Sequence, residues 1–172
     1  SNVRLMLEPV LEPELFCRYL EVVSERRKAE SVMTAVREKL SGEAGILLWE
    51  VSLSGQKGKA DHMYRFLVDG FRHGPGIVHM LGLDSVFRMY EMQRYVRNEA
   101  HLLTGFVRFA RLPEGILAGR IGPKNDVLPL VAEHFEDRLS EENWMLWDEL
   151  RDKAAVHRAD RDKVMVRGIP DS

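Results

Sequence analysis

The chain has 172 residues, 45% of them hydrophobic and 30% charged, an ordinary composition for one soluble globular domain with a real core. Its net charge of −2 excludes a bulk positive field that would draw it to nucleic acid or an anionic membrane, so any such contact needs a local patch. The single cysteine, Cys17, excludes an internal disulfide and fits a reducing compartment, and no membrane-spanning run or signal peptide is visible. We therefore expect a cytoplasmic protein with no membrane partner. We expect a single domain over residues 1–172, with a partly flexible tail over 157–172.

The first half of the chain predicts a short strand followed by helices. Residues 18–23 are rich in aromatic and β-branched side chains and predict a strand, after which Ser24 is a suitable N-cap for a helix over 25–40. The apolar run 44–53 fits a buried helix or a strand, and periodicity does not decide between them. Residues 60–71 predict a further helix, which the Gly-Pro-Gly sequence at 74–76 ends.

A longer helix is predicted from Asp84, as its N-cap, to about Leu103. Its apolar stripe has helical spacing and is typical of a core face: Met89, Met92, Val96, Ala100 and Leu103. Another side of the same helix carries Arg94, Arg97 and His101.

The second half predicts a hairpin, a helix and a third strand. The hairpin joins 104–111 to 116–121, and Asp126 is a plausible N-cap for a helix that ends near Leu139. Residues 144–148 alternate between Trp144, Leu146 and Asp148 on one face and Met145 and Trp147 on the other, as a strand does. Residues 164–166 fit an edge strand.

These elements predict an α+β fold, in which several helices pack on a small, mainly antiparallel sheet. The sheet would contain 104–111, 116–121 and 144–148, with 18–23 at an edge.

A basic and aromatic face of the predicted hairpin is the first candidate site. Alternation places Phe106, Arg108 and Arg120 on one sheet face, where a ring could stack on a base and guanidinium groups could hold phosphates. Arg94, Arg97 and His101 could extend this surface. The structural alternative is that a helix covers the face and the arginines pair with Glu91, Glu99 or Asp148.

A second candidate site combines His134, Arg138, Asp148 and Arg151. His134 and Asp148 could serve as general acid and base, with an arginine steadying an anionic substrate. The alternative is a structural ion-pair network around a buried Asp148. Trp144 or Trp147 could offer a stacking surface, although a tryptophan in the core is the commoner case.

No standard catalytic or cofactor motif is present. The sequence has no phosphate-binding glycine-rich loop after a strand, no nucleophile elbow and no pair of histidines at metal-ligand spacing on one helix. We therefore expect no metal site and no cofactor.

The chain resembles a bacterial family of DNA-metabolism and DNA-repair proteins, a domain of unknown function. The resemblance covers roughly residues 19–156 and rests on several motifs together. These are H-x-x-x-G-F-V-R-F from His101, D-V-L-P-L-V-A-x-H-F-x-x-R from Asp126, W-x-x-x-D-x-x-R from Trp144, V-V-S-x-x-x-K-A-x-x-V from Val22, and RFLVDGFRHGPG from Arg65. Family members open with a further segment that contains an aromatic-Asp-Gly motif and a Phe-rich helix. We expect this chain to lack that segment, through truncation or divergence.

The resemblance implies a role associated with DNA repair. In that family the domain stands beside, or is fused to, a uracil-DNA glycosylase-like domain, and a radical-SAM protein is a frequent genomic neighbour. The leading hypothesis is a nucleic-acid-binding or accessory module for such a partner. Two alternatives stay open: a small enzyme acting on a nucleotide or nucleic acid through His134 and Asp148, and a pure protein-interaction module.

Overall fold

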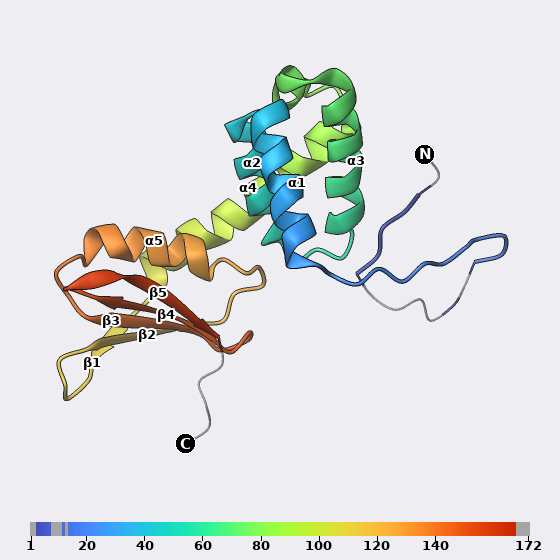
Figure 1. Cartoon of the computed structure of the whole chain (residues 1–172). Helices are drawn as coiled ribbons and strands as arrows, with labels where there is room; N and C mark the ends of the chain where they lie inside the picture. Colours follow the sequence, from blue (N-terminus) through green and yellow to red (C-terminus); the bar gives the residue numbers. More distant parts are fainter. Residues whose placement is uncertain (1–2, 8–11, 13, 168–172) are drawn as a thin grey trace. The chain divides into compact units, whose positions relative to one another are not determined.

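The computed structural model describes residues 3–7, 12 and 14–167 and has an α+β fold (Figure 1). This confirms the predicted fold class. The helices and strands follow in the order α1 (Arg26–Lys39), α2 (Gly42–Ser52), α3 (Lys59–His73), η1 (Pro75–His79), α4 (Asp84–Phe106), β1 (Phe109–Arg111), β2 (Leu117–Ile121), α5 (Leu128–Arg138), β3 (Trp144–Asp148), β4 (Lys153–Arg158) and β5 (Arg161–Arg167).

The chain divides into two compact units. Unit 1 comprises Ser1–Ser52 and Gln56–Gln93, and unit 2 comprises Leu53–Gly55 and Arg94–Ser172. Residues 84–93 of α4 therefore belong to unit 1, and residues 94–106 belong to unit 2. The single domain expected from the sequence stays a prediction, because two compact units can still unfold in one cooperative transition.

Unit 1 is helical, and its core is formed by one face of each helix. The apolar run that the sequence left open is the helix α2, buried through Leu47, Leu48 and Val51, with Trp49 on its exposed side. Met89 and Met92 of α4 are buried in the same core, as the predicted stripe requires.

The predicted strand at residues 18–23 is wrong, because these residues are exposed and take no regular secondary structure. A high β propensity forms a strand only where a neighbouring strand accepts its hydrogen bonds. The predicted N-cap, Ser24, is also wrong by one position, since Glu25 is the residue at the N-cap position of α1. The side chain of Glu25 makes no capping hydrogen bond.

Within unit 1, Asp61 of α3 accepts a hydrogen bond from the N-terminal segment at residues 3–7. Its carboxylate accepts hydrogen bonds from Arg65 Nε at 2.7 Å and from the backbone N–H of Leu5 at 3.3 Å. Burial disfavours the charged carboxylate, but these hydrogen bonds and the Arg65 charge outweigh it and lower the pKa of Asp61.

We expect this carboxylate to make unit 1 more stable at neutral pH than in acid. Because its pKa is lower in the folded state, the stabilisation is present above the unfolded pKa and is lost as the pH falls through the folded pKa. Asp61→Asn should cost less than about 1 kcal/mol at pH 7, since Arg65 is half exposed, and the difference from the parent should vanish in acid. Urea unfolding of both chains across a pH series checks this, and a cost that is constant with pH would contradict it.

Unit 2 is a five-stranded sheet with the order β1-β2-β3-β4-β5. β2 and β3 are parallel, and every other neighbouring pair is antiparallel, so the sheet is mainly antiparallel as predicted. The predicted hairpin is present as β1 and β2, and Gly115 makes its turn with a positive φ of 84°. Residues 157–167, in the tail that the sequence predicts as partly flexible, contribute to β4 and β5, and 168–172 lie outside the described residues.

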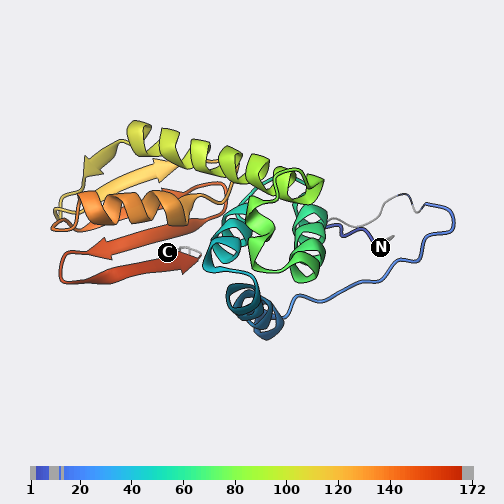
Figure 2. The same ribbon diagram turned by 90° about the horizontal axis from the view of Figure 1, so that it is seen from above.

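One face of this sheet carries the core of unit 2. Figures 1 and 2 show α5 lying over the sheet, and the cluster of buried residues joins α5 to Val96 and Ala100 of α4 and to Trp144 and Leu146 of β3. Among the described residues, no helix of unit 2 contributes to the opposite face. We call that opposite face the open face.

The beginning of α5 corrects one further prediction. Val127, and not Asp126, precedes the first turn, with a proline at the N-terminal turn. One oxygen of the Asp126 carboxylate, Oδ2, instead pairs with Lys153 of β4.

Candidate nucleic-acid interface

The open face follows from the alternation of side chains along the strands. Leu117 and Ile121 of β2 and Trp144 and Leu146 of β3 belong to the core, so the residues between them face the other way. The strand register then aligns the open-face residues in two rows: Ala118 with Met145 and Val156, and Arg120 with Trp147 and Ala154. The middle of this face is therefore apolar, with one aromatic ring beside one guanidinium group.

The Arg120 guanidinium is available to an anion. Its side chain is 69% exposed, and its ion pair with Glu149 spans 3.4 Å between Nη1 and Oε2. An ion pair as exposed as this one contributes little and is screened by salt. A phosphate could therefore replace Glu149 as the partner of Arg120 at low cost.

Trp147 is half-buried and stands directly beside Arg120 in the strand register. Its indole N–H is buried and has no hydrogen-bond acceptor among the described residues. Trp144, three positions earlier, lies on the core face and is fully buried. Of the two tryptophans, Trp147 is thus the one that a ligand on the open face would meet.

The face predicted from Phe106, Arg108 and Arg120 does not form. α4 continues to Phe106, and residues 107–108 link it to β1, so only Arg120 of the three lies in a strand. The helix continues past the end predicted near Leu103, and in its last turn the Thr104 hydroxyl donates to the His101 carbonyl. Phe106 and Arg108 are both exposed, but not in the sheet.

The other basic residues of the first candidate site lie on the helices of unit 2. Arg94, Arg97 and His101 are exposed on α4 at helical spacing, as predicted. Arg138 is exposed in the last turn of α5. These side chains belong to the helical layer, whereas Arg120 belongs to the open face.

The structure does not join His134 to Asp148. Asp148 is fully buried, and its two carboxylate oxygens accept hydrogen bonds from the backbone N–H of Leu150 at 3.1 Å and from Arg151 at 3.0 Å. His134 is exposed on α5 with its ring edge against Phe135, and within the described part of the chain no hydrogen bond connects it to Asp148. The acid–base pair stays a prediction with no contact to support it.

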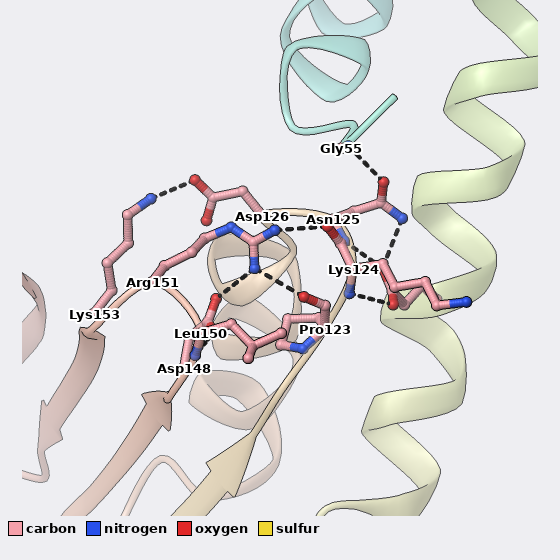
Figure 3. Close-up of polar contacts among 10 residues, drawn as sticks. Gly55, Pro123, Lys124, Asn125, Asp126, Asp148, Leu150, Arg151 and Lys153 are labelled. Carbon is pink, nitrogen blue, oxygen red and sulfur yellow. Dashed lines mark hydrogen bonds and ion pairs between the residues drawn. The ribbon is translucent and has the colours of Figure 1, made fainter. Parts of the chain in front are cut away.

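Arg151 has a structural role in this arrangement (Figure 3). Its guanidinium donates to Asp148 and also to the carbonyl oxygens of Pro123 at 2.9 Å and Lys124 at 2.7 Å. These contacts match the structural alternative, an ion-pair network around a buried aspartate. They leave Arg151 committed to the loop that connects β2 to α5.

Glu99 of α4 binds the same loop. Its carboxylate accepts hydrogen bonds from the backbone N–H groups of Lys124 at 2.7 Å and Asn125 at 2.8 Å, and from Asn125 Nδ2 at 2.6 Å. The Asn125 side chain is fully buried, and its Oδ1 accepts the backbone N–H of Gly55 at 2.8 Å. We call residues 122–126 the clamped loop.

No group of three or more His, Cys, Asp and Glu side chains could hold a metal ion in residues 3–7, 12 and 14–167. Over the same residues, no helix combines the length and the apolar character needed to cross a membrane.

Within the described residues, unit 2 is an α+β fold in which α4 and α5 cover one face of a small sheet. Comparison with family models then places the chain: the model of DUF4130, a domain of unknown function, matches residues 57–169. The chain therefore belongs to this family. No curated protein and no solved structure matches it.

The match confirms the coarser part of the resemblance, that the chain carries a domain of unknown function. It covers all of α3 to β5 and thus every candidate residue named above. The association with DNA repair remains a matter for proposal.

Proposed function

We propose that this chain is a nucleic-acid-binding accessory module of DNA repair, and that it binds single strands on the open face. The observation that carries the proposal is the row in which Arg120 stands directly beside Trp147. An aromatic ring with a neighbouring guanidinium is a combination that holds a stacked base together with its phosphate. The resemblance supplies the context, a uracil-DNA glycosylase-like domain or a radical-SAM protein as the partner.

The shape of the site favours a single strand over a duplex. The bases of a single strand can turn outward and stack on an aromatic side chain, whereas the paired bases of a duplex stack on one another. The base would lie against the Trp147 ring beside Met145, and the Arg120 guanidinium would exchange Glu149 for the phosphate.

The charge of the chain sets the expected strength of binding. Because the chain has a net charge of −2, long-range electrostatic attraction does not draw the nucleic acid to it. Stacking must therefore supply most of the binding affinity. One phosphate contact predicts a slope of about −0.7 for the logarithm of the affinity against the logarithm of salt concentration. We therefore expect weak binding with a shallow salt dependence.

Substitutions on the open face test the proposal. Trp147→Ala should weaken binding of a labelled single-stranded oligonucleotide roughly tenfold, because one stacked base contributes about 1–3 kcal/mol. Arg120→Ala should weaken binding less and should remove most of the salt slope. Fluorescence anisotropy across a salt series measures both, with a labelled duplex for comparison.

Arg138→Ala is the matched control, since it removes the same charge from an exposed position on α5. It should leave both affinity and salt slope close to those of the parent chain. Equal losses for Arg120→Ala and Arg138→Ala would show a non-specific charge effect, and unchanged binding by Trp147→Ala would remove the open face as the site. Trp147→Phe keeps an aromatic surface and should retain most of the affinity.

A further inference from the structure

An exposed apolar segment precedes the first helix. Residues 14–23 contain Leu15, Phe16, Leu20, Val22 and Val23, and each of these side chains is more than 70% exposed. A soluble surface seldom presents so many large apolar side chains in one continuous stretch unless a partner covers them. We call residues 18–23, its extended second half, the N-terminal arm.

The backbone of the arm is also without partners. Within the described chain, residues 14–23 have one backbone–backbone hydrogen bond, from the Cys17 N–H to the Glu14 carbonyl, and the Glu14 N–H donates to the side-chain hydroxyl of Tyr19 at 2.8 Å. The backbone groups of the arm take part in neither bond. The arm takes no regular secondary structure, although its Tyr, Leu and Val side chains favour a strand. It therefore offers both the unpaired backbone groups and the side chains of a strand that has no sheet.

The sheet of unit 2 has one edge long enough to accept such a strand. β5 ends the strand order and is seven residues long, whereas β1 at the other edge has three residues. A free edge of this length is a template for pairing with an added strand.

The positive charge of β5 disfavours pairing of this strand with a second copy of itself. The β5 sequence contains Arg161, Lys163 and Arg167 against a single aspartate. The arm, residues 18–23, contains Arg18 and Glu21 and has no net charge. Opposite charges on neighbouring strands stabilise their pairing, and like charges disfavour it, so β5 suits the arm better than a second copy of itself.

We propose that the arm of one chain adds as a sixth strand to the β5 edge of a second copy, so that the protein forms a dimer through strand addition. Pairing satisfies the backbone groups of both partners and covers the apolar side chains of the arm. This inference is independent of the nucleic-acid proposal, since it uses neither Arg120 nor Trp147.

Sedimentation velocity of the full chain over a concentration series provides the first test. We expect a monomer–dimer equilibrium in the micromolar range, and we expect Val22→Pro to shift it at least tenfold toward the monomer, because proline removes a backbone donor from the added strand. Residues 18–23 have no regular structure in the single chain, so this substitution should leave its circular dichroism unchanged. Leu7→Pro is the matched control, at an exposed apolar position outside the arm.

A photo-crosslinking amino acid at Leu20 identifies the occupied surface. Crosslinks in the dimer band that map to residues 161–167 are the expected result. A chain that stays monomeric throughout would overturn the proposal, as would a dimer that Val22→Pro does not weaken. Crosslinks to 161–167 in the monomer band would overturn it too, because the arm would then occupy the edge of its own chain.

Discussion

Trp144→Ala should lower the free energy of unfolding of unit 2 by about 4 kcal/mol, the usual cost of removing a fully buried aromatic side chain. Trp144 is the first residue of β3 and lies on its core face, and its ring stacks on His157 of β4 with a centroid distance of 5.3 Å and an interplanar angle of 12°. The substitution would leave a cavity and would remove the ring on which His157 stacks. His157 is itself buried, and its Nδ1 lies 3.0 Å from the Glu142 carbonyl oxygen.

Trp147→Ala is the control for this prediction, since it removes the same side chain from the same strand on the opposite face. Trp147 is half-buried, so we expect a loss of roughly 1–2 kcal/mol. Urea unfolding followed by circular dichroism measures both variants. Equal losses would contradict the assignment of the two tryptophans to different faces.

The same experiment tests whether the chain is one domain. If units 1 and 2 unfold together, Trp144→Ala shifts a single transition. If they unfold separately, only the transition of unit 2 shifts, and hydrogen exchange in α2 stays as slow as in the parent chain.

Glu99→Ala should destabilise unit 2 by about 3 kcal/mol, because it removes the acceptor of three hydrogen bonds from the clamped loop. The Asn125 side chain would remain buried with its N–H donors unsatisfied. Hydrogen exchange at Lys124 and Asn125 should speed up with the loss in stability, which a thermal or urea unfolding curve measures.

Glu99→Gln separates hydrogen bonding from packing. Glutamine fills the same space, but an NH₂ group replaces one of the two acceptor oxygens of the carboxylate. This NH₂ group would face an N–H donor of Lys124 or Asn125 and could not accept its hydrogen bond. We expect a loss close to that of Glu99→Ala, whereas Glu133→Ala, at an exposed position on α5, should change stability by less than about 0.5 kcal/mol. A glutamine variant as stable as the parent would show that Glu99 acts by packing alone.

Local pattern was sufficient for α1, α3, α5 and most of α4 and for the faces of β3, whereas it left α2 undecided between helix and strand. The stripe of α4 placed Met89, Met92, Val96 and Ala100 in cores, and alternation separated Trp144 from Trp147. These predictions succeed because the side chains of helices and strands repeat with fixed periods, whatever packs against them.

Predictions that depended on a distant partner were wrong or missing. Residues 18–23 have the composition of a strand but no neighbour within the described chain, and β4 (Lys153–Arg158) was missed because its short side chains and mixed charges carry no strand signal. The predicted first strand of the hairpin, 104–111, is longer than β1 (Phe109–Arg111), because Phe106 and Val107 suit a strand as well as a helix end.

The candidate site was predicted only in part, for the same reason. Arg120 and Trp147 each lay on the correct face of a strand, but their proximity depends on the parallel pairing of β2 with β3 across α5. The clamped loop was not foreseen, since it joins Glu99 to Asn125 over 26 positions and Gly55 to Asn125 over 70. The W-x-x-x-D-x-x-R spacing did indicate the pair of Asp148 and Arg151.

The placement of the tryptophans makes the intrinsic fluorescence of the chain a set of local probes. The three tryptophans of the sequence are Trp49, exposed in unit 1, Trp144, sealed in the core of unit 2, and Trp147 on its open face. Acrylamide should quench Trp49 most and Trp144 least, so chains that retain one tryptophan each, with phenylalanine at the other two positions, report separately on the two units and on the ligand surface. An oligonucleotide that stacks on the open face should quench the emission of Trp147 alone, without any label.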